Sequence, residues 1–244
     1  MGEKEAIMTD ETIPRRKFLV GAGLAGTAVA TGLSETTPAA AQAPAAAAPA
    51  AAQAEPLLAL NETEFAFVVA AVDTFIPADE LSPSGSDCGV AVFIDRQLAS
   101  AWGGGAKMYR SGPFVKGKPE QGYQLPLTPA EYLSAGIAAA NAWSRQIYGR
   151  DFDRLEPDKR VEALKTMEAG KAEFADFSSR AFFARLLEMT MQGFFADPIY
   201  GGNRNKVSWK MLGFPGLPAT YANLIDEYRD KRYVADPQSI ADFS

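Results

Sequence analysis

The chain has 244 residues, with 24 Lys and Arg against 30 Asp and Glu, one cysteine and no histidine. Without imidazole there is no Ser-His-Asp triad, no His-ligated haem and no ordinary zinc site. A single cysteine excludes an iron–sulfur cluster and covalent haem attachment. The mildly acidic balance, with no basic patch, argues against a nucleic-acid partner.

Residues 1–41 have the pattern of an export signal. Arg15 and Arg16 precede Phe18 and Leu19, and a weakly apolar Gly/Ala/Thr run follows, ending in small residues that a signal peptidase reads. The paired arginines predict twin-arginine (Tat) export and a periplasmic mature protein. Two alternatives are a cytosolic arginine pair before a buried helix and a retained anchor, although the run is shorter than the roughly 20 residues that a span needs.

Residues 42–55 are almost entirely Ala, Pro and Gln, which predicts a semi-rigid tether without a core. The remaining residues, 56–244, are long enough for one domain that buries a core without disulfides or metals.

Helical signals begin directly after the tether. Asn61 and Glu64 form a capping box for a helix that Pro77 ends, and a second helix is predicted over residues 89–100, before the glycines at 103–105. The predicted inward face of the first helix is Phe65, Val68, Val69, Val72, Phe75 and Ile76, and that of the second is Val90, Phe93, Ile94 and Leu98.

The Gly/Pro-rich stretch at 103–127 predicts a long loop, and loops of this length are usually functional or face a partner. Thr128, Pro129 and Glu131 then give an N-cap, a first-turn proline and a capping-box glutamate for a helix that ends at Gly149. Its predicted inward residues are Tyr132, Leu133, Ile137, Trp143 and Ile147.

Two further helices are predicted over residues 158–169 and 178–195, and a last helix begins at Pro218 after a second long loop. No sustained period-two runs occur. The predicted fold is therefore mainly α, a single irregular helical domain with long Gly/Pro-rich loops. The inward residues expected for the 178–195 helix are Phe182, Phe183, Leu186, Leu187 and Met191, and those for the last helix are Tyr221, Leu224, Ile225 and Tyr228.

Two motifs suggest chemistry that their context does not support. Residues 21–26 match the G-x-G-x-x-G dinucleotide fingerprint, but they lie inside the export signal with no βαβ unit around them. Asp151, Asp153 and Glu156 resemble the start of a calcium loop but lack its turn glycine and its late glutamate. We expect a solvated loop there, and no metal or cofactor in this chain.

Cys88 lies in a polar Ser/Gly/Asp stretch, so we expect its side chain to be exposed. An unpaired cysteine in an oxidising compartment suggests either a disulfide to another subunit or an inert thiol. Both alternatives stay open.

Residues 197–216 combine Gly pairs, Pro and Asn with aromatic side chains and charge. This composition predicts a sharp, rigid loop of the kind that forms interaction hot spots. A substrate-binding loop is the alternative, but no acid, base or metal-ligand set accompanies it. The residues expected at a partner interface are Tyr200, Gly201, Gly202, Asn203, Arg204, Trp209 and Phe214.

The same segment carries a family resemblance. Its Asp-Pro-x-Tyr-Gly-Gly-Asn run at 197–203, Trp209-Lys and the Gly-Phe-Pro-Gly run at 213–216 resemble the gluconate 2-dehydrogenase subunit 3 family. Phe75-Ile-Pro77 and the 89–98 helix with Asp95 are similar to weaker features of that family. The resemblance spans about residues 60–228.

The resemblance implies the small, non-catalytic subunit of a periplasmic sugar-acid dehydrogenase complex. It implies two partners: a glucose-methanol-choline-type flavoprotein that holds FAD, and a multihaem cytochrome c that links the complex to the inner membrane. In such complexes the small subunit typically carries the Tat signal and escorts the folded flavoprotein. The resemblance transfers no catalytic residue and no cofactor to this chain.

Three functions are therefore compared. The favoured one is an accessory subunit that binds, stabilises and escorts a flavoprotein. The others are an independent periplasmic enzyme using carboxylates and a stand-alone periplasmic binding or structural protein. The sequence determines neither the partner's substrate nor the cleavage site nor the stoichiometry.

Overall fold

The computed structural model describes residues 56–243 apart from 116, 119–120, 176–177 and 219. The chain divides into two units, Met1–Ala52 and Gln53–Ser244, and the first lies wholly outside the described residues. The predicted export signal, with Arg15, Arg16, Phe18 and Leu19, and the tether therefore also lie outside them.

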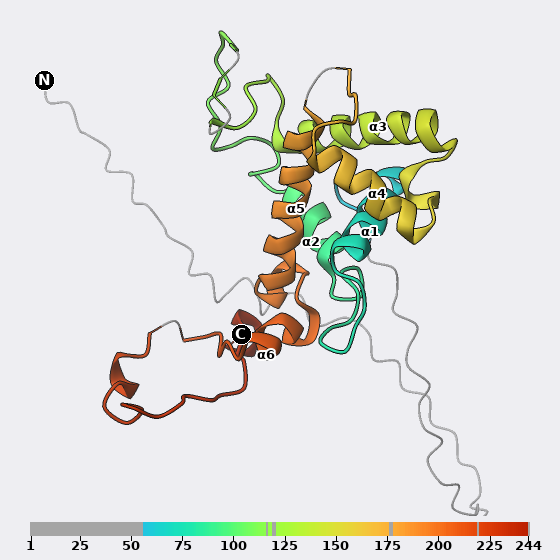
Figure 1. Ribbon diagram of the computed structural model, residues 1–244. Helices are drawn as coiled ribbons and strands as arrows, with labels where there is room; N and C mark the ends of the chain where they lie inside the picture. The colour runs from blue at the N-terminus through green and yellow to red at the C-terminus, as the bar shows by residue number, and fades with distance from the viewer. Residues whose placement is uncertain (1–55, 116, 119–120, 176–177, 219, 244) are drawn as a thin grey trace, which may run out of the picture. The chain divides into compact units, whose positions relative to one another are not determined.

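The described part of the second unit is built from helices and loops, with no strand beyond one isolated bridge between Gly216 and Gln238 (Figure 1). This confirms the mainly α class. The α-helices are α1 (Glu62–Phe75), α2 (Val90–Ala99), α3 (Pro129–Tyr148), α4 (Pro157–Glu168), α5 (Ser179–Phe195) and α6 (Val207–Leu212). The short 3-10 turns are η3 (Phe152–Arg154), η4 (Pro198–Tyr200), η5 (Arg204–Lys206), η6 (Ala222–Leu224) and η7 (Ile240–Phe243).

The predicted helix starts are confirmed where side chains cap them. Asn61 accepts a hydrogen bond from the Glu64 amide and Glu64 accepts one from the Asn61 amide, which completes the capping box of α1. Thr128 and Glu131 form the same reciprocal pair before α3, and Gly149 ends that helix in the left-handed conformation. Local chemistry alone therefore fixes these three helix ends.

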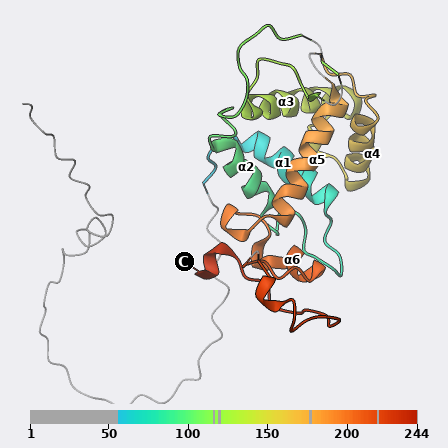
Figure 2. The ribbon, with the colours of Figure 1, turned by 90° about the vertical axis from the view of Figure 1, so that its left-hand side faces the viewer.

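The core forms where α5 packs against α4, α2, α3 and α1 (Figures 1 and 2). Phe67 of α1 lies at its centre, with its ring centroid 4.8 Å from that of Phe152 and 6.1 Å from that of Phe182. All three side chains are fully buried. Burial of aromatic groups of this size is a major source of stability in a domain without disulfides.

Asp95 fastens the first described residues to the core. Its carboxylate is buried on α2 and accepts hydrogen bonds from the backbone N–H groups of Leu58, Ala59 and Leu60, at 2.8, 3.0 and 2.8 Å. The carboxylate thus pairs the backbone donors of a segment that has no helix of its own. The segment before α1 is therefore held both by Asp95 and by Leu60, which is part of the buried core.

Some predicted inward positions are wrong. Ile147 and Met191 are exposed, at 55% and 41%, although their spacing places them on the apolar faces of α3 and α5. Both lie toward the ends of their helices, and periodicity identifies a face without showing how far the neighbouring helices cover it. Phe67, which the predicted face of α1 omitted, is a central core residue.

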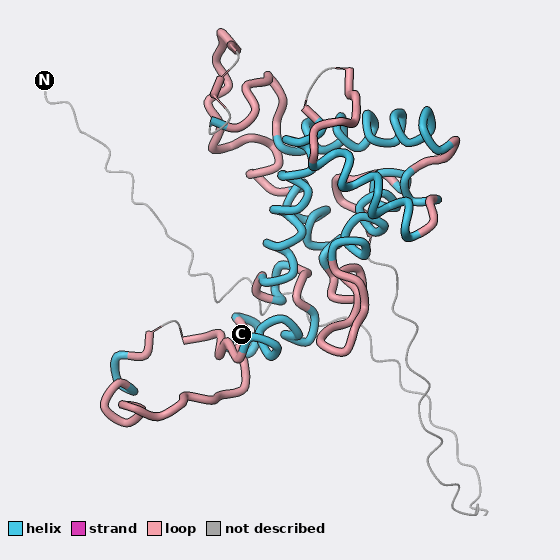
Figure 3. Tube along the Cα trace, viewed as in Figure 1, coloured by secondary structure: helices cyan, strands magenta, loops and turns pink. Residues whose placement is uncertain are grey.

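The predicted helix after Pro218 is also wrong. Residues 220–236 contain the η6 turn but no α-helix, and Figure 3 shows this segment as a nearly continuous loop after α6. None of its described residues is buried, so the helical spacing of its apolar side chains has no surface to pack against. Conversely, α6 lies within a segment predicted to be a loop, because six residues are too few to give a helical period.

Candidate partner-binding surface

The first turn of the 197–216 segment is set by Asp197. One carboxylate oxygen accepts the Ile199 amide at 3.0 Å and starts η4, and the other accepts the Ile240 amide at 2.9 Å. One side chain therefore shapes the turn and attaches η7 beside it. Ile199 and Tyr200 on η4 are exposed, as are Ile240 and Phe243 on η7.

Asn203 holds the end of α5 to the start of α6. It is fully buried in the left-handed conformation, with φ of 45°. Its side-chain amide donates to the Ala196 carbonyl at 2.9 Å, and its side-chain oxygen accepts the Ser208 amide at 3.0 Å. The predicted rigidity of this loop thus has a definite source, but Asn203 is inside the fold and not on its surface.

The Gly-Gly pair lets the loop approach other backbone closely. A Cβ at position 202 would lie 2.1 Å from the Gly193 carbonyl oxygen of α5. Gly201 has φ of 99°, a conformation that favours glycine. The Arg204 amide then donates to the Cys88 carbonyl at 3.0 Å, just before α2. The motif therefore docks the loop onto the ends of α5 and α2.

Trp209 is buried as well, at 6% exposure, and its indole N–H donates to the Phe195 carbonyl at 3.0 Å. Phe214 packs against it edge-on, with centroids 5.2 Å apart, and is itself half exposed. A protein bound to this surface would contact Phe214 and Tyr200. Asn203, Gly202 and Trp209 would act by positioning them.

Sequence reasoning missed much of the exposed apolar surface here, because it did not predict α6. The exposed large apolar side chains of this segment, called here the 197–216 set, are Ile199, Tyr200, Met211, Leu212 and Phe214. Leu212 is the most exposed, at 62%. Contiguous exposed apolar side chains are typical of interaction surfaces, and these five lie close together in the chain, within residues 199–214.

The expectation that Cys88 is exposed is wrong, because only 1% of the residue is accessible. The turn around it folds inward, as Asp73 accepts hydrogen bonds from the Ser86 amide and hydroxyl at 2.7 and 2.9 Å. Burial, aided by the negative charge of Asp87, raises the pKa of the thiol. Such a setting favours the inert thiol over the intersubunit disulfide, which would require this turn to open.

The carboxylates that resemble a calcium loop have structural partners. The Asp151 carboxylate pairs with Arg145, and the Asp153 carboxylate lies 3.9 Å from Nε of Arg154. Over the described part of the chain, no group of three or more Cys, Asp or Glu is arranged to hold a metal ion. Within the same residues, no helix combines the length and apolar character needed to cross a membrane.

Several surface cavities lie away from the 197–216 segment. One of about 1030 Å³ opens between the 114–125 loop and the start of α5, beside the stacked rings of Tyr123 and Tyr132. Burial raises the pKa of Tyr132 to about 12, so its hydroxyl stays protonated at neutral pH.

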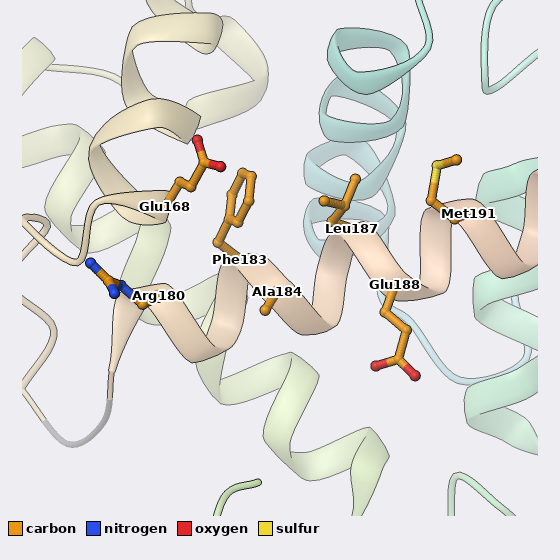
Figure 4. Close-up of a pocket in the computed structure, with 7 residues that line it drawn as sticks. All are labelled: Glu168, Arg180, Phe183, Ala184, Leu187, Glu188 and Met191. Atoms are coloured by element: carbon orange, nitrogen blue, oxygen red, sulfur yellow. The ribbon is translucent and has the colours of Figure 1, made fainter. Parts of the chain in front are cut away.

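The second cavity, of about 660 Å³, follows α5 (Figure 4). Phe183, Leu187 and Met191 project from one face of the helix at four-residue spacing, and Glu168 of α4 lies next to Phe183. Arg180 and Glu188 add charge at its edge. It is an apolar hollow with a charged border.

These features define a class of protein: a small helical domain with an aromatic, glycine-shaped loop and an exposed apolar surface. The family model described as gluconate 2-dehydrogenase subunit 3 matches residues 62–216, from the first residue of α1 to the end of the loop. The chain belongs to this family, as its resemblance predicted. No curated protein and no solved structure matches the chain.

Proposed function

We propose that this chain is the non-catalytic small subunit of a periplasmic, FAD-dependent dehydrogenase complex of the gluconate 2-dehydrogenase type. In this role it binds the folded flavoprotein subunit, stabilises it and escorts it through the Tat system. The observation that carries the proposal is the family match over residues 62–216, since the family description names one subunit of a larger enzyme.

The residues of the chain support this division of labour. It has no histidine and one cysteine, which is buried, so redox chemistry would be supplied by FAD and haem c in partner subunits. Arg15 and Arg16 supply the Tat pattern, and this route carries folded proteins. A flavoprotein that takes up FAD in the cytoplasm is folded before export and would therefore need the Tat route.

The surface proposed for the flavoprotein is the 197–216 set. Rigid presentation lowers the entropy lost on binding, and the buried contacts of Asn203 and Trp209 supply that rigidity. Fewer than about a third of interface residues cost more than about 1 kcal/mol of binding free energy when truncated, and the few hot spots near the centre cost about 2 kcal/mol or more.

The first experiment is an absorption spectrum of the tagged chain purified from the periplasm of its own host. Flavin bands are expected, with or without cytochrome bands. A colourless, folded monomer would remove the escort role and favour a stand-alone binding or structural protein.

Two variants then test the surface. Leu212→Ser should reduce the flavin retained per chain about tenfold or more, a loss equivalent to about 1.4 kcal/mol or more of binding free energy. Ile147→Ser, at a similarly exposed site on α3, should retain it. Equal retention by both variants would place the flavoprotein elsewhere.

A further inference from the structure

Residues 217–237, called here the C-terminal arm, leave the domain and return to the same place. The Leu217 amide donates to the Gln238 carbonyl at 2.9 Å, and the Gln238 amide donates to the Pro215 carbonyl at 3.0 Å. The Lys206 ammonium group donates to the Pro237 carbonyl at 3.0 Å. Both ends of the arm are therefore fastened to the 197–216 segment.

The residues after the arm strengthen this attachment. Asp242 forms an ion pair with Lys206 and accepts hydrogen bonds from the Ser239 amide and hydroxyl at 2.6 and 3.0 Å. Asp197 holds the Ile240 amide. The base of the arm thus adjoins the turn that presents Ile199 and Tyr200.

Between its ends the arm is stabilised by almost no burial against its own domain. No described residue from Pro218 to Asp236 is buried, and Ile225 and Val234 are 59% and 75% exposed. Ordering a backbone costs about 1–2 kcal/mol per residue, and loops longer than about 12–15 residues usually have a function.

The arm nevertheless has a defined shape. The Tyr233 ring packs edge-on against Tyr228 and Tyr221, with centroids 4.9 and 5.9 Å apart. The Tyr221 hydroxyl donates to the Gly216 carbonyl at 3.2 Å. Tyrosines held in this way offer a large contact area at low entropic cost, which is why they are frequent in protein interfaces.

We propose that the C-terminal arm is an interaction surface that lies along the flavoprotein subunit and is buried by it. This rests on the proposed function. The family match ends at Gly216, just before the arm, so the arm lies directly after the part of the chain that the family model covers. Its base is continuous with the surface proposed for the same partner.

The charge of the arm indicates that it binds a protein rather than a membrane surface. It carries four acidic residues against three basic ones, whereas attraction to an anionic bilayer needs a basic cluster. Charges of both signs, including the exposed Arg229–Asp226 pair, are interspersed with the apolar side chains along the arm. Protein interfaces likewise combine apolar and polar side chains.

The test compares two double variants of the full-length tagged chain, expressed in its own host. Ile225→Ser with Val234→Ser should lower the flavin retained per chain at least tenfold, with an unchanged circular dichroism spectrum. Ile147→Ser with Val161→Ser, at exposed sites on α3 and α4, should stay within twofold of the wild type.

Hydrogen exchange in the wild-type complex gives a readout that needs no variant. The amides of Leu224, Tyr228 and Lys231 donate hydrogen bonds inside the arm and are expected to be protected in any case. In the complex, most other amides of residues 220–236 should be protected from exchange as well. Arm variants that retain flavin like the wild type, or arm amides that exchange like an unfolded chain, would overturn the arm proposal alone. A wild-type chain without flavin would overturn the proposed function, and this inference with it.

Discussion

Gly202 determines how the loop after α5 meets the rest of the domain. Gly202→Ala would place a methyl group 2.1 Å from a backbone carbonyl oxygen that has no rotamer to move. We expect this variant to lower the free energy of unfolding by about 1–3 kcal/mol, the usual cost of overpacking. Urea denaturation measures it. Gly104→Ala is the control, because its new Cβ would meet nothing closer than 3.6 Å, and an equal loss in both would contradict the close-approach argument.

Asp95 is a second residue whose role is structural and specific. Asp95→Ala leaves three backbone donors without their acceptor and should lower the free energy of unfolding by about 3 kcal/mol. Asp95→Asn keeps an oxygen for the Ala59 and Leu60 amides and loses the bond to Leu58, so it should lose less. Urea denaturation separates the two variants, and full stability of Asp95→Ala would show that the N-terminal segment is held by other contacts.

Cys88 provides a residue-scale prediction about oxidation. Since burial raises the pKa of its thiol, we expect the folded chain to react with iodoacetamide at least tenfold more slowly than the urea-denatured chain. Non-reducing gels distinguish an intersubunit disulfide at Cys88 from an inert thiol. A heavier band that Cys88→Ser abolishes would establish the intersubunit disulfide.

At the scale of elements, η7 is attached to the 197–216 segment by the ion pair between Asp242 and Lys206. The hydrogen bond from Lys206, helped by Ser239, lowers the pKa of Asp242 from 3.8 to about 2. A carboxyl whose pKa is lowered by folding stabilises the fold above its unfolded pKa and loses that contribution as pH falls through the folded value. The attachment should therefore be complete at pH 5 and lost between about pH 4 and pH 2.

Hydrogen exchange of the Ser239 amide, followed against pH, measures this release. Asp242→Asn should speed its exchange at neutral pH, while Asp226→Asn, in an exposed pair on the arm, should leave it unchanged. If the Ser239 amide exchanges equally fast in the wild type and in Asp242→Asn at neutral pH, the Asp242 carboxylate does not hold η7 in place.

The helices also show which elements a sequence can predict. The starts of α1 and α3 and the end of α3 follow from a few neighbouring residues, because capping side chains and a left-handed glycine act within one turn. The fate of residues 218–236 depends on whether a distant surface covers their apolar side chains. Nothing in the described fold does, and the predicted helix is absent.

At the scale of the whole molecule, the twin-arginine pair makes the escort role testable. Replacing Arg15 and Arg16 together by Lys keeps the charge but removes the Tat pattern. Both this chain and its partner's dehydrogenase activity should then stay in the cytoplasm, at least tenfold depleted in the periplasmic fraction. A general-secretion protein of the same cells is the control. Periplasmic dehydrogenase activity in this variant would contradict the escort role.

The sequence by itself determined the mainly α class, the family and the position of the loop that carries its motif. These depend on helical periodicity, capping and a run of Gly, Asn and Trp, which are all local in the chain. Only the tertiary structure decided that Asn203, Trp209 and Cys88 are buried, and that Tyr200, Leu212 and Phe214 are exposed. The exposure of a residue depends on which distant segments of the chain pack over it. Here those segments are the end of α5 and the start of α2, which contact the 197–216 loop closely at its glycines.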